Sequence, residues 1–438
     1  MDHRGRLPRK LSRLRSKLGR KAKQEPGFRF YALYGHILRP DVLQAAWEIV
    51  RDSKGGRTPG VDGVTVDHIV NGEGGVGKFL AELEHALRTK SFVPDPVKRV
   101  MIPKANGQER PLGIPTIRDR VVQMAILLLL EPIFEADFLD CSYGFRPGRS
   151  AKDAVAEITS NVWKDYRAIY DADLKGYFDS IPHDKLMKGL EQRISDRSML
   201  RLIRLFLRAP VQEGNGPPRR SDSGTPQGGV ISPLLANSFL HWFDRAFYSR
   251  SGPGTWAKAR LVRYADDFVI MARFLDGRVE HWVEQTIESR LGLELNRAKT
   301  RTLNMEDEGT ILEFLGYSFR WSRSHRSGGG PRYVRVEASK KARAKARAKL
   351  RDLTGPRFCF LPPEDVVMNM NRFLRGWLAY FSMGHPTKVR WDLVRFAEDR
   401  VARHLRRRSQ RPYRPPKGVP LQKHAHALGL IALTAGGG

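Results

Sequence analysis

The sequence predicts an α+β fold, with helices and a β-sheet in the larger N-terminal part and a helical, strongly basic C-terminal part. The first observation is that helical patterns alternate with short strand-like runs between residues 29 and 320. These runs are not spaced as regular strand–helix–strand units, which favours an α+β sheet over a parallel array. The second observation is that residues 331–438 combine helical patterns with several basic runs. We find no internal repeat, and the length suggests two or three domains.

The first 28 residues form a basic extension. Residues 1–24 contain ten Lys or Arg and a single acid, Asp2. Four leucines recur at spacings of four, three and four: Leu7, Leu11, Leu14 and Leu18. This spacing is typical of an amphipathic basic helix, while the composition is equally typical of a disordered basic tail. The sequence leaves both alternatives open, and either would add affinity for phosphates.

The central part carries both helical and strand-like runs. Helical patterns occur at three places: Asp41–Arg51, Phe79–Leu87 and Val121–Leu130. The third run is almost wholly apolar but too short to span a bilayer, so we expect a core helix. Strand-like runs occur at Arg99–Pro103 and Ile169–Leu174. Two further runs, Leu261–Tyr264 and Phe268–Met271, flank a turn and predict a hairpin.

The C-terminal part, residues 331–438, is predicted to be a basic helical domain. A Ser/Arg/Gly stretch before it, Ser322–Gly330, is a candidate linker or hairpin loop. Ser339–Arg351 carries seven basic residues and no acid, and its alternation with alanine favours a helix. Arg403–Lys417 is again basic. A further helix is predicted from apolar residues that share one face: Val366, Val367, Met370, Phe373, Leu374, Trp377, Leu378 and Phe381.

The net charge indicates a polyanionic partner. The 438 residues contain 77 Lys and Arg against 47 Asp and Glu, which gives a formal net charge of +30 at pH 7. Such a charge favours nucleic acid, with an anionic membrane surface as the second alternative. The two cysteines, Cys141 and Cys359, form neither a disulfide framework nor a metal-ligand cluster. We therefore expect a reducing, cytoplasmic location and no membrane-spanning segment.

Two acidic sites are candidates for chemistry. The first lies in Tyr170–Asp179 and contains Asp173. The second lies in Arg263–Ile270, where Asp266 and Asp267 stand at the turn of the predicted hairpin. Adjacent carboxylates between buried strands repel each other unless a cation neutralises them. An isolated Asp-Asp pair is most often only a polar turn, but the apolar flanks and the upstream acidic strand favour a metal site here.

The three aspartates offer hard oxygen ligands, which suit Mg²⁺. Nucleotidyl transfer needs two such ions about 4 Å apart, one for the attacking 3′-hydroxyl and one for the leaving pyrophosphate. Three carboxylates from two strands supply ligands for such a pair. The pattern therefore predicts a nucleotidyl-transfer site at Asp173, Asp266 and Asp267.

The motifs around these aspartates resemble those of reverse transcriptases, and more narrowly those of group II intron-encoded reverse transcriptase/maturases. Tyr264–Asp267 (YADD) resembles the catalytic hairpin of the family, and Asp173 stands in the matching acidic strand (DLKGYFD). Thr225–Leu234 resembles the template-handling segment. Further motifs typical of the intron-encoded group follow in order: Pro59–Val64, Arg110–Pro115, Tyr143–Gly148, Phe314–Tyr317 and Arg375–Phe381. The resemblance runs from about residue 29 to near the C-terminus.

The resemblance implies a right-hand polymerase fold. Fingers and palm would occupy residues 29–320, with the carboxylates on an antiparallel palm sheet, and a helical thumb that doubles as the maturase region would occupy residues 331–438. The implied catalytic and metal-binding residues are Asp173, Asp266 and Asp267, with the backbone carbonyl of Leu174 as an extra ligand. Direct contact of Asp267 with metal is left open. The implied cofactor is a pair of Mg²⁺ ions, with Mn²⁺ as a substitute.

The resemblance also implies residues that handle the incoming nucleotide. Lys104 and Arg110 would grip its triphosphate. Phe178 would lie against the ribose and exclude a 2′-hydroxyl. Gln227 would help to position the base pair, and Lys299 would lie near the leaving pyrophosphate as a general acid.

The implied function is RNA-directed DNA synthesis together with binding of intron RNA to assist splicing and retrohoming. Its partners would be group II intron RNA, an RNA template with a DNA primer, deoxynucleoside triphosphates and target DNA, near the nucleoid of a bacterium. Two alternatives stay open: a splicing maturase with little polymerase activity, and a reverse transcriptase of a CRISPR-associated, antiphage-defence or diversity-generating system. The intact Asp173 and Tyr264–Asp267 disfavour the first, and the maturase-like C-terminal part disfavours the second.

Larger members of the family end with a DNA-binding segment and a cysteine-rich HNH endonuclease. Cys359 is the only cysteine in the C-terminal third of this sequence, so we expect no zinc-stapled nuclease in it. Cleavage of a target strand is then not expected of this chain. A primer would come from elsewhere, for instance from a nascent strand at a replication fork.

Overall fold

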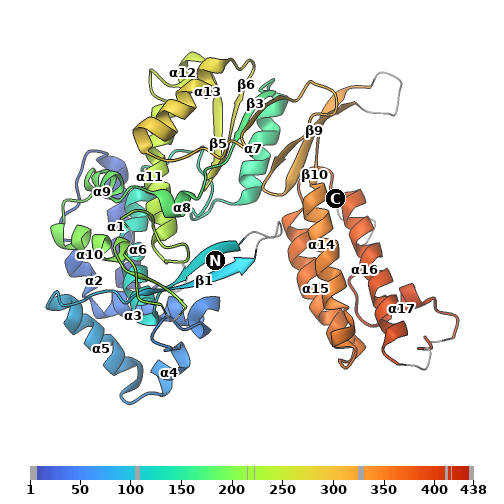
Figure 1. The fold of residues 1–438 in the computed structure, drawn as a ribbon, viewed down its shortest axis with the longest axis horizontal. Helices are drawn as coiled ribbons and strands as arrows, with labels where there is room; N and C mark the ends of the chain where they lie inside the picture. Colours follow the sequence, from blue (N-terminus) through green and yellow to red (C-terminus); the bar gives the residue numbers. More distant parts are fainter. Residues whose placement is uncertain are drawn as a thin grey trace. The chain divides into compact units, whose positions relative to one another are not determined.

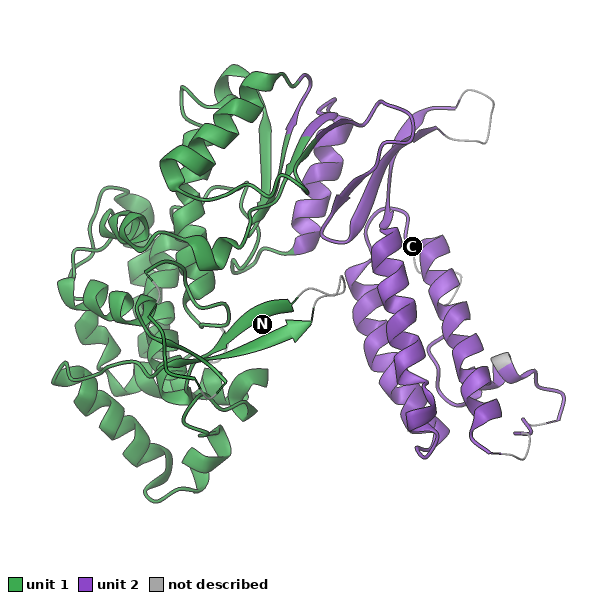
Figure 2. Ribbon diagram, viewed as in Figure 1, with its two compact units in different colours: residues 1–150, 170–270, 275–301 green, residues 151–169, 271–274, 302–438 purple. Residues whose placement is uncertain are grey.

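The computed structural model describes residues 7–103, 109–214, 216–220, 222–323, 330–409, 413–415 and 417–433. Figure 1 shows its elements, and Figure 2 shows that the chain divides into two compact units. Unit 1 comprises residues 1–150, 170–270 and 275–301, and unit 2 comprises residues 151–169, 271–274 and 302–438. Each unit is therefore built from segments that are distant in sequence. The predicted limits at residues 28, 320 and 331 concern functional domains and stay predictions.

Helices form the N-terminal part of unit 1. They are α1 (Arg9–Gln24), α2 (Tyr34–Ile37), α3 (Pro40–Asp52), η2 (Lys54–Arg57), α4 (Val66–Asn71), α5 (Gly75–Arg88) and α6 (Ile117–Glu135). α6 lies at the centre, because α1, α2, α3 and α11 (Ser232–Phe247) all contact it. Its side chains are buried on nearly all sides, including Val121, Leu129 and Leu130. The predicted core helix is therefore confirmed.

The basic N-terminal segment is helical in the structure, which decides between the two alternatives that the sequence left open. α1 buries Leu11 and Leu18 on the face that contacts α6. Arg15 forms an ion pair with Glu131 of α6 at 2.5 Å. These tertiary contacts stabilise a helix that its own backbone hydrogen bonds would support only marginally.

The remaining elements of unit 1 include a three-stranded sheet of order β2-β1-β4. In it, β1 (Val97–Pro103) is antiparallel to β2 (Glu109–Ile114) and parallel to β4 (Val211–Glu213). The helices that follow in the chain are α8 (Tyr177–Ser180), α9 (His183–Glu191), α10 (Arg197–Leu207), α12 (Pro253–Trp256), α13 (Gly277–Glu284) and the π-helical η3 (Gln285–Leu291).

A four-stranded sheet of order β5-β6-β3-β7 carries the two acidic sites. Its strands are β5 (Arg260–Tyr264), β6 (Asp267–Ala272), β3 (Ala168–Ala172) and β7 (Arg301–Asn304). β5 and β6 are neighbours joined by two residues, so the predicted hairpin is confirmed. Val262 and Phe268 to Ala272 are fully buried, which explains why these runs form strands. The division between the two units falls within β3, β6 and β7.

Unit 2 contains a sheet and most of the C-terminal helices. Its strands are β8 (Leu312–Phe314), β9 (Tyr317–Arg323) and β10 (Arg332–Ala338), and its helices are α7 (Ala151–Trp163), α14 (Lys340–Leu353), η4 (Pro356–Phe358), α15 (Pro363–Tyr380), α16 (Thr387–Arg407) and α17 (Leu421–Ala427). Arg323 pairs with Arg332, so the Ser/Arg/Gly stretch connects a hairpin and is not a linker between domains. α15 buries the predicted apolar face, including Val366, Leu374 and Trp377.

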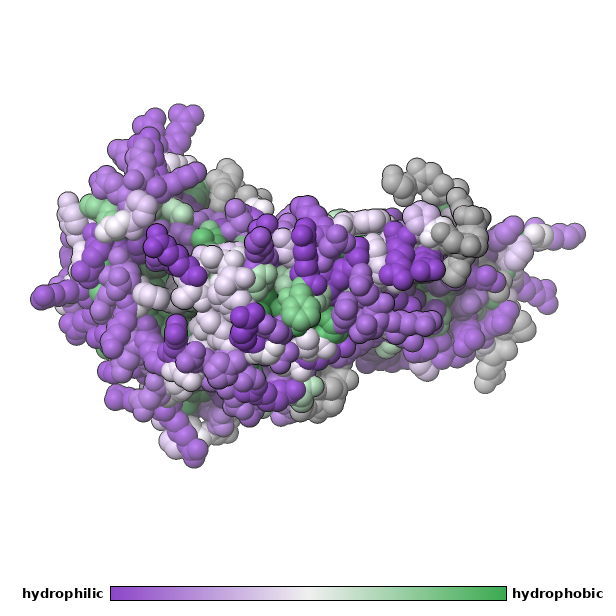
Figure 3. Space-filling view, turned by 90° about the horizontal axis from the view of Figure 1, so that it is seen from above, coloured by the Kyte–Doolittle hydropathy of each residue, from purple (hydrophilic) through white to green (hydrophobic). Residues whose placement is uncertain are grey.

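No helix in the described part of the chain is both long and apolar enough to cross a bilayer. Figure 3 shows that hydrophilic residues cover most of one face of the molecule. This agrees with a sequence in which 28% of the residues are charged.

Candidate active site

The turn between β5 and β6 carries Asp266 and Asp267. Ala265 precedes them with φ of +58°, a left-handed conformation that is uncommon for residues other than glycine. Gly144 makes room for this turn, because a Cβ at position 144 would lie 2.5 Å from the Ala265 backbone nitrogen. Close packing of two backbone segments therefore fixes the turn and holds both carboxylates at the end of the sheet.

Asp173 directly follows β3, which neighbours β6 in the same sheet. Its carboxylate accepts a hydrogen bond from Nδ2 of Asn296 at 3.0 Å, and its main-chain carbonyl accepts one from the Asn296 N–H at 2.8 Å. Nζ of Lys299 forms an ion pair with the same carboxylate. The Lys299 N–H donates to the Asn296 carbonyl at 2.9 Å, so one tight turn presents both partners to Asp173.

The three carboxylates perturb one another. Loss of solvent around Asp267, a hydrogen bond to Asp173 and the negative charges of Asp266 and Asp173 raise the pKa of Asp267 to about 8, although one side of this residue is exposed. Burial also raises the pKa of Asp266; Asp173 adds to this shift, while Arg110 and Lys299 oppose it. Carboxylates that repel each other in this way favour a bound cation.

The donor set suits a divalent cation chemically, but its side chains are not arranged around one. Within the described ranges, no three His, Cys, Asp or Glu side chains form a group that could hold a metal ion. The carboxylate of Asp173 instead pairs with Lys299 and shares a hydrogen bond with Asp267. Leu174 and Leu295 form an isolated β-bridge, whose hydrogen bonds are made by the residues on either side of them. The Leu174 carbonyl, which was predicted as a metal ligand, takes no part in these bonds. Lys299 would have to leave Asp173 before a metal ion could take its place.

Two of the residues predicted to handle a nucleotide are hydrogen-bonded to each other. Nε of Arg110, on β2, donates to Oε1 of Gln227 at 2.8 Å. The Gln227 carbonyl accepts a hydrogen bond from the N–H of Gly113, also on β2, at 2.6 Å. The side chain and the backbone of Gln227 thus both form hydrogen bonds with β2. Lys104 lies outside the described residues.

Phe178, in α8, is held by the same segment of chain. Its main-chain carbonyl accepts a hydrogen bond from the N–H of Thr225, two residues before Gln227, at 2.7 Å. Its buried ring packs edge-on against Phe145, with ring centroids 6.3 Å apart. The short segment from Thr225 to Gln227 therefore forms hydrogen bonds with both Phe178 and Arg110.

The chain matches two protein-family models. Residues 102–319 match the reverse transcriptase (RNA-dependent DNA polymerase) family, and residues 343–418 match the group II intron maturase-specific domain. Protein YkfC of Escherichia coli K12 is 36% identical over 347 residues, which are 72% of this chain and 89% of that protein.

The chain belongs to the reverse transcriptase family and carries a group II intron maturase-specific domain. The group II intron-encoded protein LtrA of Lactococcus lactis is 31% identical to this reverse transcriptase, over 67% of this chain and 57% of LtrA. A 91 kDa protein in the cob intron of Schizosaccharomyces pombe is 35% identical, over 48% of this chain and 25% of that protein. The reverse transcriptase thus spans little more than half the length of LtrA. A telomerase structure from Candida albicans aligns with a TM-score of 0.39 at 15% identity, over 71% of this chain and 59% of that one, which is too distant to support an argument.

The predicted α+β fold and the predicted family are therefore confirmed, while the roles of individual residues stay predictions. One group near the site was missed by the sequence motifs. Arg263 of β5 and Asp244 of α11 are fully buried, and their side chains are joined by hydrogen bonds of 2.5 and 2.8 Å. Arg263 also donates to the Ala265 carbonyl at 2.9 Å, inside the turn that carries the carboxylates.

Asn237 of α11 extends this buried network of the reverse transcriptase. Its Oδ1 accepts from Arg263 at 3.1 Å, and its Nδ2 donates to the Gly144 carbonyl at 2.7 Å. The network therefore holds both backbone segments that pack at the turn. An arginine inside an apolar strand and an aspartate inside an apolar helix were the only signals of it in the sequence.

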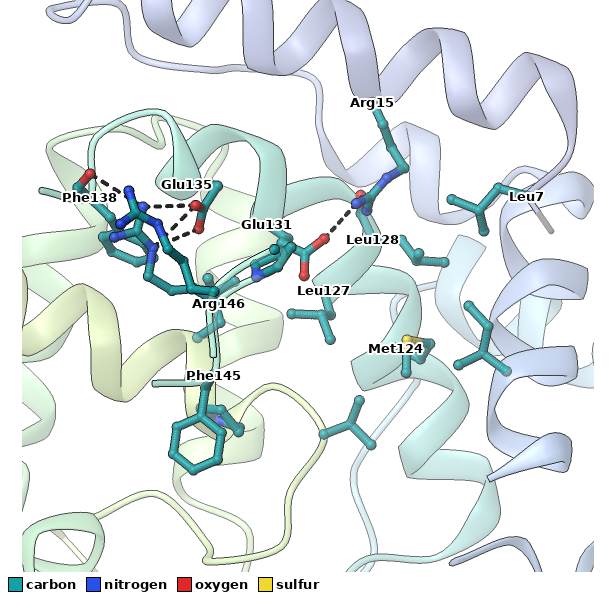
Figure 4. A pocket seen from close by; sticks show the side chains of 17 residues that line it. Leu7, Arg15, Met124, Leu127, Leu128, Glu131, Glu135, Phe138, Phe145 and Arg146 are labelled. Carbon is teal, nitrogen blue, oxygen red and sulfur yellow. Dashed lines mark hydrogen bonds and ion pairs between the residues drawn. The ribbon is translucent and has the colours of Figure 1, made fainter. Parts of the chain in front are cut away.

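A cavity of about 520 Å³ lies in unit 1 of the reverse transcriptase (Figure 4). α1, α6, residues 145–149 and the start of α11 line it, with mostly apolar walls. Phe145 touches both this cavity and Phe178, which connects the two. Four charged residues of the wall pair with one another, Arg15 with Glu131 and Arg146 with Glu135, and the fifth, Arg149, pairs with Asp140.

Proposed function

We propose that this protein is an RNA-directed DNA polymerase that extends a DNA primer on an RNA template, with Asp173, Asp266 and Asp267 as its catalytic carboxylates. The observation that carries the proposal is the grouping of the three carboxylates in a chain of the reverse transcriptase family. Burial, together with the charge of the neighbouring carboxylates, raises the pKa values of Asp266 and Asp267. Reverse transcriptases as a family use divalent metal ions. For this chain we propose Mg²⁺.

The carboxylates of Asp173, Asp266 and Asp267, with the Leu174 carbonyl, would hold two Mg²⁺ ions. Bound ions of this kind activate the primer hydroxyl and stabilise the leaving pyrophosphate. The contribution of Lys299 follows from its pairing with Asp173, which raises the pKa of its ammonium group. If Asp173 bound a metal ion instead, the pKa of the Lys299 ammonium group would fall, and Lys299 would be a better proton donor to the leaving pyrophosphate.

Arg110, Lys104, Gln227 and Phe178 would bind the incoming deoxynucleoside triphosphate. The hydrogen bond from Arg110 to Gln227 supports this, because it presents a guanidinium beside the segment that holds Phe178. A guanidinium is well suited to a triphosphate. The ring of Phe178 would exclude a ribose 2′-hydroxyl by its bulk.

The same protein would bind group II intron RNA and assist splicing through binding energy alone, since the RNA supplies the chemistry of splicing. The match of residues 343–418 to the maturase-specific domain supports this second role. Lys340, Lys341 and Lys345 of α14 are exposed and available to phosphates. Target DNA would then receive the intron during retrohoming.

Primer extension on an RNA template tests the polymerase role. We expect the wild type to add deoxynucleotides in the presence of Mg²⁺, and Asp266→Asn to lose extension by at least about a thousandfold, because removal of one ligand disrupts the two-ion site. Asp67→Asn, an exposed aspartate in the first turn of α4, is the matched control and should extend normally. Equal extension by the wild type and Asp266→Asn would refute the proposal.

A splicing assay separates the two roles. Asp266→Asn should bind intron RNA and promote splicing as the wild type does, because its fold and basic surface are unchanged. If splicing falls to the same degree as extension, the division into two roles is wrong.

A further inference from the structure

A second basic surface lies on α10, a helix of unit 1 that carries none of the predicted catalytic residues. Four arginines recur at spacings of four, three and four, so they lie on one face of the helix and its C-terminal cap: Arg197, Arg201, Arg204 and Arg208. All four are exposed, whereas Leu202, Ile203 and Phe206 bury the opposite face. In Figure 1, α10 lies at a distance from the β5–β6 hairpin of the same unit.

These arginines have no acidic partner. None of them forms an ion pair with another described residue, and α10 itself contains no acid. The acid that precedes the helix, Asp196, is already engaged, because its carboxylate accepts from the N–H groups of Ser198 and Met199 at 3.0 Å and of Tyr34 at 2.7 Å. Like charges at this spacing destabilise a helix, so the row of arginines favours a polyanionic partner that neutralises it.

A cavity of about 240 Å³ lies at the N-terminal end of the row. Arg197, Arg201 and Lys90 share it with the aromatic rings of Tyr34 and Phe92. Three cations beside the half-buried ring of Tyr34 suit a nucleotide, whose base stacks on that ring while its phosphate meets the cations. Phe92 is only 2% exposed and is a buried part of the wall.

The aromatic wall of this cavity is rigid. The Tyr34 hydroxyl donates to the Leu87 carbonyl at 2.7 Å. Phe92 packs against Phe206 of α10, with ring centroids 5.7 Å apart, and Arg118 covers its ring at 4.4 Å. A wall fixed in advance loses little conformational entropy when a base stacks on it.

We propose that the α10 face, defined as these four arginines and the adjoining cavity, binds a structured RNA. The arginines contact its phosphate backbone, and the cavity takes one unpaired nucleotide. This inference rests on the proposed function, because that function is the reason for choosing RNA as the partner. Duplex DNA or an anionic membrane would engage the arginines but leave the cavity without a role, whereas structured RNA offers unpaired bases beside a helical backbone.

Two variants with the same loss of four charges test the backbone contact. One changes Arg197, Arg201, Arg204 and Arg208 to Gln, and the control changes the exposed Arg250, Lys258, Arg260 and Arg290 of the same unit to Gln. The probe is a short RNA hairpin with one bulged adenosine, and fluorescence anisotropy measures its binding without nucleotides at several salt concentrations. We expect the α10 variant to bind about tenfold more weakly or worse and to lose about three to four units of the salt slope, and the control to change far less.

A third variant tests the cavity. Ser198→Trp places a large ring in the cavity that Ser198 lines. We expect the wild type to prefer the bulged hairpin to a fully paired one, and Ser198→Trp to lose this preference while its salt slope stays unchanged. Melting temperatures close to that of the wild type are required of all variants.

Several outcomes would overturn the inference. If the α10 variant binds RNA as strongly as the control variant does, the four arginines are only a solvated face of the helix. If the α10 substitutions weaken binding to anionic lipid vesicles but not to RNA, the face is a membrane site. Equal binding of both hairpins to the wild type would remove the cavity's role. Because no nucleotide is present, a wild type that binds the hairpin but fails to extend a primer contradicts the polymerase proposal and leaves this inference intact.

Discussion

Lys299 decides the charge state of the candidate site. Its ammonium group pairs with Asp173, the same carboxylate that a metal ion would need, and Asp173 in turn hydrogen-bonds to Asp267. In the metal-free state, one ammonium group and the hydrogen bond between Asp173 and Asp267 therefore offset part of the charge of the three carboxylates. Binding of divalent cations should displace both, and so should release protons.

The raised pKa of Asp267 predicts that the metal-free protein loses stability as the pH rises. The pKa shifts from the ordinary value of 3.8 to about 8 in the folded protein. Between these values the folded state binds a proton that the unfolded state lacks, so this contribution to stability is complete below the lower value and is lost as the pH passes the upper one. We expect the urea midpoint, measured in EDTA by circular dichroism, to fall over this range.

Asp267→Asn is the control for this titration, because its amide cannot ionise. Its urea midpoint should fall less than that of the wild type over the same pH range. Parallel profiles for the two proteins would assign the loss of stability to other groups. Addition of Mg²⁺ should restore part of the stability of the wild type at high pH, since the cation stabilises the ionised carboxylate.

At the scale of elements, the ion pair between β5 and α11 positions the turn that carries Asp266 and Asp267. Arg263 and Asp244 have no solvent contact, so the charge of each side chain is stabilised by the opposite charge of the other and not by water. We predict that Asp244→Ala lowers the free energy of unfolding by about 3–5 kcal/mol, because it leaves a buried arginine unpaired. Urea unfolding measures this loss, and Asp352→Ala, which removes an exposed acid that pairs with Lys349, should cost far less.

The double variant Arg263→Met, Asp244→Leu separates stability from positioning. Replacement of a buried pair by apolar residues often restores stability. The Ala265 carbonyl and Asn237 would nevertheless lose their donor. We expect the double variant to unfold near the wild-type urea concentration but to extend primers more slowly; wild-type extension would mean that the pair serves stability alone.

The same comparison shows what the sequence can and cannot predict. The β5–β6 hairpin was predictable, because its apolar runs and its turn are local features of the chain. The Arg263–Asp244 contact joins residues 19 positions apart in different elements, and the Asn296–Asp173 contact joins residues 123 apart. No local pattern encodes such pairings. Lys299 and Arg110 were reached only because the motifs around them resemble a known family.

At the scale of the whole molecule, the net charge of +30 should make the affinity for nucleic acid depend strongly on salt. We predict that its affinity for RNA falls linearly with salt on logarithmic axes, by about 0.7–0.9 units of slope for each phosphate contacted. Anisotropy titrations over a salt series measure this slope. EDTA should abolish primer extension yet leave RNA binding in place, and loss of both in EDTA would show that binding also depends on metal.

The segmented make-up of unit 2 also bears on how the protein is synthesised. α7 contacts β10, but α7 ends at Trp163 and β10 begins only at Arg332. A ribosome that adds about 5–20 residues per second leaves this helix without its strand for roughly ten to thirty seconds. During that time Val155, Ile158 and Val162, all buried in the finished protein, are uncovered on the nascent chain. Because the apolar face of α7 is exposed during this interval, slow translation or a shortage of chaperones should lower the yield of soluble protein.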